Sequence, residues 1–407
     1  MPFRTKLAIL LWVSAATISL RYVFGDLQTF GEQQYLEYIT PYISYFSLAH
    51  ILVLALLYKS ARSVLSGRTA AIALLISTIA LSAPGDLLLT RWWLAIILLW
   101  AWSLATLHRE IIHKSSTGDY FLHIIIILGL VEALIGLTQY ALQHSLGLSL
   151  LGEPVANVET LGVAKVVVSG VKMLRPFGTF AHANVFGGFI VVSILALLSQ
   201  RSALSRTVQQ ITLGILLFGV LFSYSRSAWI ATVLICAIFM AKLGWRSFAA
   251  PIATLLIAAA LFFPPLFSRF ELNQNPQQLD VRALSTGYAL ESIVESPLGL
   301  GFRQFIPRLL DAYPDQRDYY YQPAHNVALL LASELGIFGF VLLIVIVAGL
   351  LRRYRATSMA IVVLLVLSLG SFDHYLVTLP QGLGILGLIF LVGLVPRVTA
   401  TQSDQTF

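Results

Sequence analysis

Charge is scarce in this chain. Only 11% of its 407 residues are Asp, Glu, Lys or Arg, whereas 58% are hydrophobic. Soluble domains carry roughly 25% charged residues, so this composition excludes a water-soluble globule. Apolar runs of about 17–25 residues recur instead, each long enough to cross roughly 30 Å of hydrocarbon as a helix. The sequence therefore predicts an all-α polytopic membrane protein that forms one integral membrane domain, 1–407.

Cysteine and familiar cofactor motifs are also lacking. The single cysteine, Cys236, excludes an intramolecular disulfide and a multi-cysteine metal site. The chain has no His-Glu-x-x-His and no Gly-x-x-x-x-Gly-Lys-Ser/Thr, and Gly299-Leu-Gly301 lacks a third glycine and a preceding strand. Asp315 and Asp318 flank a basic residue and imply no further ligands. We expect no metal, no cofactor and neither an ATP nor a dinucleotide site.

The apolar runs predict about twelve spans. They lie near 7–24, 39–58, 69–83, 90–107, 120–143, 183–199, 207–223, 227–242, 247–264, 324–350, 357–371 and 381–396. The first run is long and lacks a cleavage site, so we expect a retained helix rather than a signal peptide. Two connections, 144–182 and 265–323, are long enough to carry function. Within them, Val163–Leu174 predicts a short strand or a hairpin on the membrane surface, and Val281–Glu295 predicts an amphipathic helix.

The net charge of +7 follows the predicted topology. Twelve spans put both termini on one side, where basic residues outnumber Glu110, Asp119 and Asp404. These basic residues are Arg4, Lys6, Lys59, Arg62, Arg68, Arg109, Lys114, Arg201, Arg206, Lys242, Arg246, Arg352, Arg353, Arg355 and Arg397. The positive-inside rule makes this side cytoplasmic and puts both long loops outside. The basic excess is therefore a topology signal, and we expect no nucleic-acid partner.

Arginines gather at the predicted outer edge of the membrane. Arg226 follows so short a connection that its guanidinium must lie near membrane depth, which is costly without a partner. A planar guanidinium matches phosphate oxygens in a bidentate way, so a lipid pyrophosphate would suit it. Snorkelling to the interface is the alternative for Arg226, and an exposed salt bridge is the alternative for Arg282.

Arg175 precedes a proline and is expected to be extended. Small residues follow it as a helix begins, among them Gly178, Gly187 and Gly188. They allow close backbone approach, either for phosphate at the helix N-terminus or for helix packing.

His325 stands at a junction between a polar segment and an apolar helix. Pro323 favours a helix that begins there, with His325 on its first turn at the membrane boundary. A histidine in this position can change protonation near neutral pH, although it could equally cap the helix. Tyr313 and the run 319–321, which ends at Tyr321, offer aromatic faces for sugar rings.

Three ionisable residues fall inside predicted spans: Arg21, Glu132 and Glu334. Such residues face protein or a water-filled cavity, so a proton-coupled transporter is one alternative. Glu334 lies nine residues after His325, about half a turn out of phase, so we do not pair the two. We expect Glu334 to satisfy another helix, and Arg21 and Glu132 are candidates to pair.

From about Arg175 to Gly382, the order of these motifs resembles the O-antigen ligase and O-antigen polymerase superfamily of membrane glycosyltransferases. The matching elements are Arg-Pro-Phe-Gly-Thr-Phe-Ala-His-Ala-Asn at 175–184, Ser-Tyr-Ser-Arg-Ser-Ala-Trp at 223–229, Val-Arg at 281–282, Ser-Pro-Leu-Gly-Leu-Gly at 296–301, Ala-His-Asn-Val-Ala-Leu at 324–329 and Glu-Leu-Gly at 334–336. The first five spans match in topology alone.

The resemblance implies a GT-C-like fold in a bacterial inner membrane, with cytoplasmic termini and an active site on the periplasmic face. It implies an undecaprenyl-diphosphate-linked glycan donor held by Arg175, Arg226 and Arg282. His325 would act on the acceptor hydroxyl, with inversion and without a metal. The residues that would bind or orient the acceptor are Asp373, Tyr321 and His182, and Asp373 could instead orient an arginine.

A ligase in lipopolysaccharide biosynthesis would transfer the glycan to lipid A-core or another glycolipid. A polymerase of the same superfamily would add it to another lipid-linked glycan, and this alternative stays open. A lipid-linked oligosaccharide transporter is the second alternative. A transporter should carry polar positions down to the cytoplasmic face, whereas here they cluster outside, so an enzyme is favoured.

Overall fold

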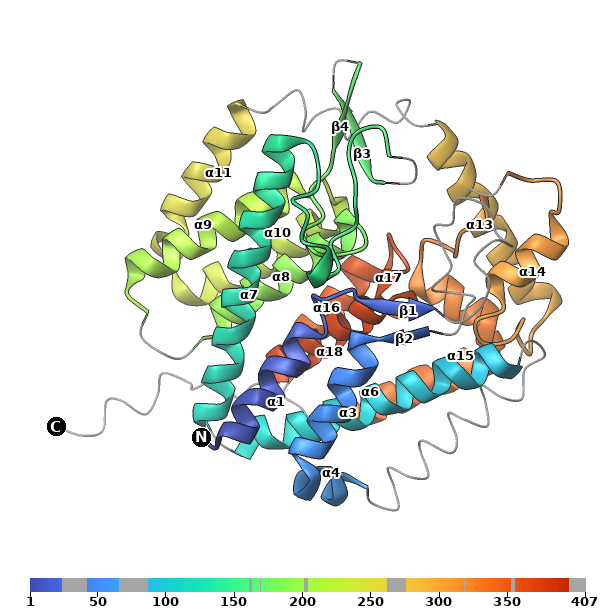
Figure 1. Ribbon diagram of the computed structural model, residues 1–407, viewed down its shortest axis with the longest axis horizontal. Helices are drawn as coiled ribbons and strands as arrows, with labels where there is room; N and C mark the ends of the chain where they lie inside the picture. Colours follow the sequence, from blue (N-terminus) through green and yellow to red (C-terminus); the bar gives the residue numbers. More distant parts are fainter. Residues whose placement is uncertain are drawn as a thin grey trace.

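A computed structural model describes residues 1–23, 42–65, 87–113, 115–160, 163–168, 170–200, 204–261, 276–317, 320–352 and 356–394. Helices dominate these ranges (Figure 1). They are α1 (Phe3–Ser14), α3 (Tyr45–Leu56), α4 (Tyr58–Val64), α6 (Leu87–His113), α7 (Ser115–Leu142), α8 (Ala183–Ser199), α9 (Arg206–Phe222), α10 (Arg226–Leu243), α11 (Ala249–Leu261), α13 (Pro276–Glu295), α14 (Phe305–Ala312), α15 (Val327–Leu351), α16 (Ala356–Gly370), α17 (Tyr375–Thr378) and α18 (Pro380–Leu394). Short 3-10 turns occupy Ser149–Leu151 and Trp245–Ser247.

Two antiparallel strand pairs accompany the helices. Strand β1 (Arg21–Val23) pairs with β2 (Tyr42–Ser44), and β3 (Lys165–Val168) pairs with β4 (Val171–Leu174). The second pair confirms the hairpin predicted for Val163–Leu174, and α13 confirms the helix predicted in the second long loop.

Four described helices are long and apolar enough to cross a membrane. They contain Thr90–Ile112, Ser116–Leu142, Arg226–Leu243 and Val327–Gly349. The pair α3 and α4, bent by 95°, qualifies as a fifth, and α8, α9 and parts of α16 and α18 are shorter apolar helices. These helices support a membrane protein, while the count of twelve spans and the GT-C-like fold stay predictions. The expected span 69–83 lies outside the described residues.

The first predicted span, 7–24, is wrong in its second half. Helix α1 ends at Ser14, and Arg21–Val23 form a strand. Beyond the helix, the Thr17 carbonyl accepts hydrogen bonds from Thr179 Oγ1 at 3.1 Å and from Gln381 Nε2 at 2.5 Å. These two long-range bonds satisfy the carbonyl without a further helical turn. They join the N-terminal segment to the first long loop and to α18.

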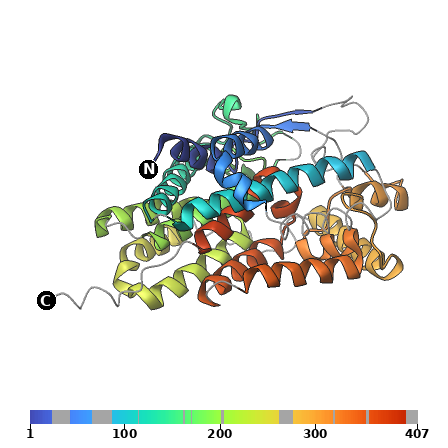
Figure 2. The same ribbon diagram turned by 90° about the horizontal axis from the view of Figure 1, so that it is seen from below.

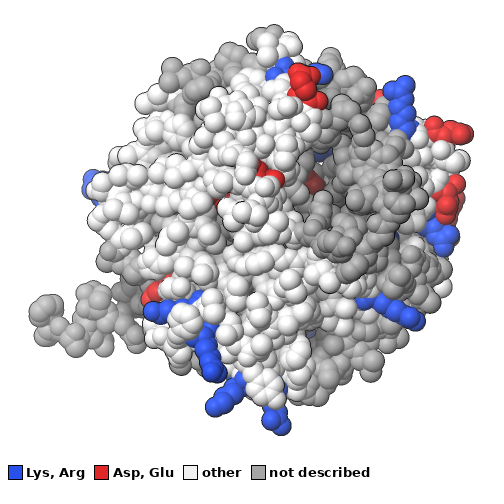
Figure 3. Space-filling view, in the orientation of Figure 1, with Lys and Arg blue, Asp and Glu red and all other residues white. Residues whose placement is uncertain are grey.

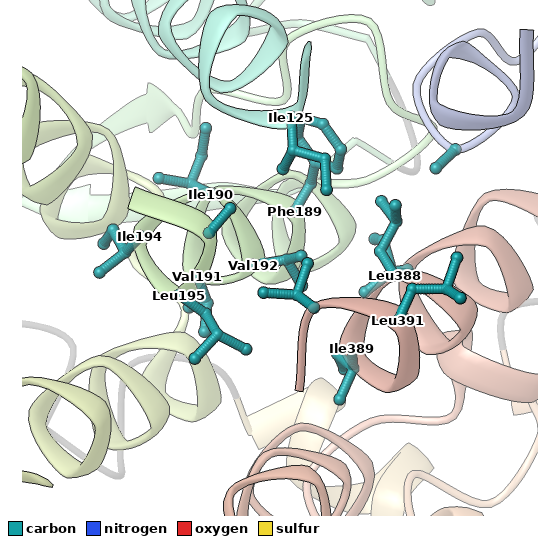
Figure 4. Packing of buried hydrophobic residues seen from close by; sticks show 14 of the residues in the cluster. Ile125, Phe189, Ile190, Val191, Val192, Ile194, Leu195, Leu388, Ile389 and Leu391 are labelled. Atoms are coloured by element: carbon teal, nitrogen blue, oxygen red, sulfur yellow. The ribbon is translucent and has the colours of Figure 1, made fainter. Parts of the chain in front are cut away.

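Helix α8 lies at the centre of the molecule, and all seventeen of its residues are buried. It packs against α7, α9, α10 and α18. Its apolar side chains meet those of α7 and α18 around Ile125, Val192 and Leu388 (Figure 4). Gly187 and Gly188 face Ser223 and Tyr375, which leaves no room for a Cβ at Gly188. The two glycines therefore serve packing, one of the two roles that the sequence left open.

Charged side chains are distributed differently at two ends of the molecule. The start of α1 and α4 lie at one end, and β3, β4, α13 and α14 lie at the opposite end (Figure 1). The N-terminal helices and α15 occupy opposite faces (Figure 2). On the face shown in Figure 3, Lys and Arg side chains gather over the first end, and both signs of charge appear over the second. Largely uncharged surface lies between the two ends, as a membrane-embedded belt requires.

Helix α15 is interrupted at Gly336, which has φ 68° and ψ 168°. The segment after α13 fills the break: Leu300 N–H donates to Ser333 O at 2.9 Å, and Ile337 N–H donates to Pro297 O at 3.1 Å. A Cβ at Gly336 would overlap the Pro297 carbonyl. Two motifs separated in the sequence, 296–301 and 334–336, therefore meet backbone to backbone.

Candidate active site

Polar residues from five separate segments meet where α8, α10 and α15 begin. They come from the loop before α8, the turn between α9 and α10, helix α13, the segment before α15, and the loop 371–374. Helix α13 contributes Arg282. The charge of this residue acts on Arg226, His325 and His374, which belong to three of the other segments. The structure thus brings together most of the residues singled out from the sequence.

Arg175 lies beneath this cluster and is only 4% exposed. Its Nε–H donates to Ser223 O at 3.0 Å, and its Nη2 donates to Asn184 Oδ1 at 2.7 Å. Both bonds are to protein atoms. The guanidinium therefore ties the beginning of α8 to the turn between α9 and α10, where Tyr224 adopts a left-handed φ of 52°.

The side chain of Asn184 connects Arg175 to Asp373 by hydrogen bonds. Its Nδ2 donates to Asp373 Oδ2, and Asp373 Oδ1 accepts the backbone N–H of His374 at 2.7 Å. Burial opposes the carboxylate charge, but His374, His325, His182 and the Asn184 hydrogen bond hold the pKa of Asp373 well below its usual range. A continuous row, Arg175 to Asn184 to Asp373, therefore ends at the histidines.

Three histidines surround Asp373. The rings of His325 and His374 lie edge to face, with centroids 5.1 Å apart. His374 Nδ1 lies 2.8 Å from Thr378 Oγ1, and that hydroxyl donates to His374 O at 3.1 Å, so the hydrogen-bond pattern assigns the proton to Nδ1. His182 Nδ1 accepts the Asn184 N–H at 3.1 Å. Both rings are thus fixed by their neighbours.

His325 differs from the other two. Its Nδ1 is buried, and no described residue forms a hydrogen bond with it. Burial, together with the charges of His374 and Arg282, lowers the pKa of His325 to about 3, although Asp373 opposes this shift. The imidazole is therefore neutral at neutral pH. A neutral, unbonded ring nitrogen among charged groups is suited to accept a proton from a bound molecule.

The expected helix start at Pro323 is wrong. Helix α15 begins at Val327, with Asn326 as its N-cap, because Asn326 Oδ1 accepts the Leu329 N–H at 3.1 Å. Asn326 Nδ2 also donates to Ser371 O at 3.3 Å. His325 consequently precedes the helix rather than lying on its first turn, and it is held against the loop that carries Asp373.

Two arginines of this site have no hydrogen-bond or ion-pair partner among the described residues. Arg226 is the first residue of α10, Arg282 lies on α13, and both are half-buried. Their positive charges act on each other. Within the described part of the chain, no hydrogen bond or ion pair reaches either guanidinium. Two cations that interact electrostatically, without a partner in the described part of the chain, are suited to bind an anion.

Tyr321 belongs to the hydrophobic cluster around α14. It is buried, and its hydroxyl donates to Tyr313 O at 2.6 Å and to Gln316 O at 3.2 Å. The ring thus stabilises the turn after α14. The neighbouring Tyr319 lies outside the described residues. The acceptor role expected of Tyr321 stays a prediction.

Two buried glutamates, Glu132 and Glu334, hold backbone groups of other segments. Glu132 accepts the Thr179 N–H at 3.0 Å and the Thr179 Oγ1 hydroxyl at 2.7 Å, which fixes the turn before α8. Glu334 accepts the N–H of Phe305, the first residue of α14, at 3.4 Å, so it satisfies another helix as expected. The side chain of Arg21, the suggested partner of Glu132, lies outside the described residues.

Sequence reasoning missed the contribution of Arg303. It is 1% exposed with φ 66°, and it donates to Thr378 O at 3.2 Å and to Val377 O at 2.6 Å. Its guanidinium carbon lies 3.6 Å from the centre of the Trp93 ring. Arg303 therefore fastens the segment after α13 to α17, which carries the loop of Asp373. An arginine within the apolar run around Phe302 was the available signal.

Part of the chain that forms this cluster is similar to a known protein family. Residues 211–344 match the O-antigen ligase family model. The matched residues include Arg226, Arg282 and His325, and the match confirms the resemblance to the O-antigen ligase and polymerase superfamily. Members of the family are glycosyltransferase-like enzymes. No curated protein and no solved structure matches the chain.

Proposed function

We propose that this protein is a glycosyltransferase of the O-antigen ligase type. It would move a glycan from an undecaprenyl-diphosphate carrier to an acceptor hydroxyl on a glycolipid. The observation that carries the proposal is the electrostatic contact of Arg226, Arg282 and His325, whose guanidinium groups and ring Nδ1 find no hydrogen-bond partner among the described residues. The match over 211–344 supplies the reaction class.

The two arginines would hold the diphosphate of the donor. Each guanidinium offers parallel N–H donors that fit phosphate oxygens in a bidentate way. As the glycosidic C–O bond to the carrier breaks, negative charge grows on the diphosphate oxygen that leaves. Fixed cations that already face this oxygen stabilise that charge without reorganisation.

His325 would accept the proton of the acceptor hydroxyl. The acceptor oxygen forms a bond to the anomeric carbon as the carrier departs from its other side, so the configuration inverts. An arriving diphosphate adds negative charge beside His325, which raises its low pKa toward the range in which a general base is effective. Asp373 would then stabilise the imidazolium that forms.

Arg175 would support this machinery from beneath. Its hydrogen bonds run to Ser223 and Asn184, so they fix the turn before Arg226 and the amide that holds Asp373. In this proposal Arg226 and Arg282 contact the diphosphate, and Arg175 positions them.

The site would face the periplasm from the inner membrane. The basic end at α1 and α4 would then be cytoplasmic by the positive-inside rule, and the opposite end, with α13 and the hairpin of β3 and β4, would lie outside (Figures 1 and 3).

A polymerase is the second candidate. It must rebind its own lipid-linked product and therefore needs two diphosphate sites, whereas the described residues offer one unpartnered arginine pair. This observation favours a ligase. Purified protein should be given lipid-diphosphate-linked single repeat units with and without a glycolipid acceptor. We expect product only with the acceptor. A ladder of longer lipid-linked chains without it would establish the polymerase, and no transfer in either case would favour a transporter.

A further inference from the structure

Helix α13 exposes an apolar face. Leu279, Leu290 and Val294 are 46%, 52% and 81% exposed, and Ala283 and Gly287 lie exposed between them. At 100° per residue, these five residues fall within roughly 80° of the helix circumference. We call them the α13 strip. A helix in a water-filled loop would place polar side chains on its exposed face.

The remaining faces of α13 are distinct. The face opposite the strip carries the buried residues Val281, Ser285, Ala289 and Ser292, and α13 packs against α15. One edge of the strip carries the exposed acidic residues Asp280, Glu291 and Glu295. The other edge carries Arg282, which belongs to the site. An apolar face bordered by charged edges is typical of a helix that lies in a membrane interface.

The α13 strip continues into the surface of a membrane-spanning helix. Leu298, just after α13, is 74% exposed, and Phe338 of α15 is 69% exposed. The bond from Ile337 N–H to Pro297 O at 3.1 Å holds the segments of these two side chains together. Further along α15, Val341, Ile344 and Val345 are exposed within the candidate span. Exposed apolar residues of a span face acyl chains.

We propose that α13 is inserted in the outer leaflet along the α13 strip, with phospholipid acyl chains as its partner. The continuity with the lipid-facing side of α15 selects lipid over a second protein chain, and the acidic edge would point to water. The second long loop is then partly a membrane element rather than a periplasmic connection. If the proposed function holds, Arg282 lies at the depth of lipid head groups, where a carrier diphosphate is found.

Neighbouring residues on α13 supply matched test positions. Single cysteines would replace Leu290, Glu291, Val294 and Glu295 in a Cys236→Ser background and carry a bimane label. The full-length protein would be reconstituted in phosphatidylethanolamine and phosphatidylglycerol vesicles, with and without brominated acyl chains. Phe338→Cys is the lipid-facing control.

We expect brominated lipid to quench the labels at 290 and 294 severalfold more than those at 291 and 295, and aqueous iodide to show the reverse order. Equal iodide quenching at all four positions would overturn the proposal, because the strip would then face water. Protection of 290 and 294 from both quenchers would also overturn it and indicate a protein partner. The readout needs no transfer activity, so failure of the proposed function would not affect it.

Discussion

His325 is the residue of the cluster that we expect to act as general base, because its buried Nδ1 has no partner among the described residues. We expect His325→Ala to lower kcat by roughly 10²–10⁴-fold, the usual contribution of a general base. Donor-lipid affinity should change little, since the arginines hold the diphosphate. Turnover assays and donor binding to the purified variant measure the two effects separately. The exposed His144→Ala is the control, and loss of donor binding in His325→Ala would contradict this division of roles.

We expect substitutions of Arg226 and Arg175 to have different effects, because Arg226 would contact the donor diphosphate and Arg175 would position the site. Arg226→Lys should lower kcat/KM by roughly 10–100-fold, because an ammonium cannot reproduce a charge-assisted bidentate bond worth about 1.5–3 kcal/mol. Arg175→Lys should reduce thermal stability and leave the donor KM near the native value, because its bonds run to Ser223 and Asn184. The exposed Arg206→Lys should change neither quantity. A raised donor KM in Arg175→Lys would make that residue a diphosphate ligand.

The histidines also predict how stability depends on pH. Burial lowers the pKa of His325 to about 3 and that of His374 to about 4, whereas an unfolded histidine titrates near about 6.5. Between these values the unfolded chain binds more protons than the folded one, so stability is full above about pH 6.5 and falls as the pH decreases. The melting temperature should therefore be lower at about pH 5 than at pH 7.

His374→Gln tests the source of this dependence. The variant removes one of the two depressed groups, so the difference in melting temperature between the two pH values should shrink. An undiminished difference would assign the pH dependence to other groups.

Among the elements, α15 depends on a glycine at its break. Gly336→Ala places a Cβ against the Pro297 carbonyl at a φ of 68°, so we expect a loss of roughly 1–3 kcal/mol in the free energy of unfolding. Gly349 lies in the same helix with open space around it. Gly349→Ala should be neutral or slightly stabilising. Equal melting temperatures for the two variants would show that the break tolerates a side chain.

The periodicity of hydrophobic residues correctly predicted those elements that are determined by their own short stretch of sequence. The Val-rich run at 163–174 formed the hairpin, and the amphipathic run at 281–295 formed most of α13. The predicted boundaries failed where side chains decide them. Asn326 caps α15 and moves its start past His325, and the bonds of the Thr17 carbonyl end the first helix early. Such bonds depend on distant residues, which periodicity does not reveal.

For the site, the order of motifs predicted which segments would meet, and the structure places Arg226, Arg282, His325 and Asp373 in one cluster. Their chemical roles stay predictions. The row from Arg175 through Asn184 was not predictable, because it depends on the direction of side chains rather than on their spacing. The bonds from the Tyr321 hydroxyl to Tyr313 O and Gln316 O depend on side-chain direction in the same way.

For the whole molecule, the separation of charge between the two ends predicts its orientation. In a Cys236→Ser background, Asp315→Cys lies beyond α14 and Arg62→Cys lies on α4, and both native residues are exposed. An impermeant thiol reagent added to intact cells should label the first position and spare the second. The reverse pattern would move the site to the cytoplasm.

The junction at Thr17 also has a consequence for biogenesis. Its carbonyl accepts bonds from Thr179 and Gln381, which lie 162 and 364 residues further along the chain. A nascent chain folds from its N-terminus as synthesis proceeds. The bond from Gln381 to the Thr17 carbonyl therefore cannot form until α18 has been made. Thr179 lies just before α8, and Asp373 just before α17. A partly synthesised chain therefore carries Arg226 and Arg282 but not yet the loop with Asp373, so the cluster is complete only near the end of synthesis.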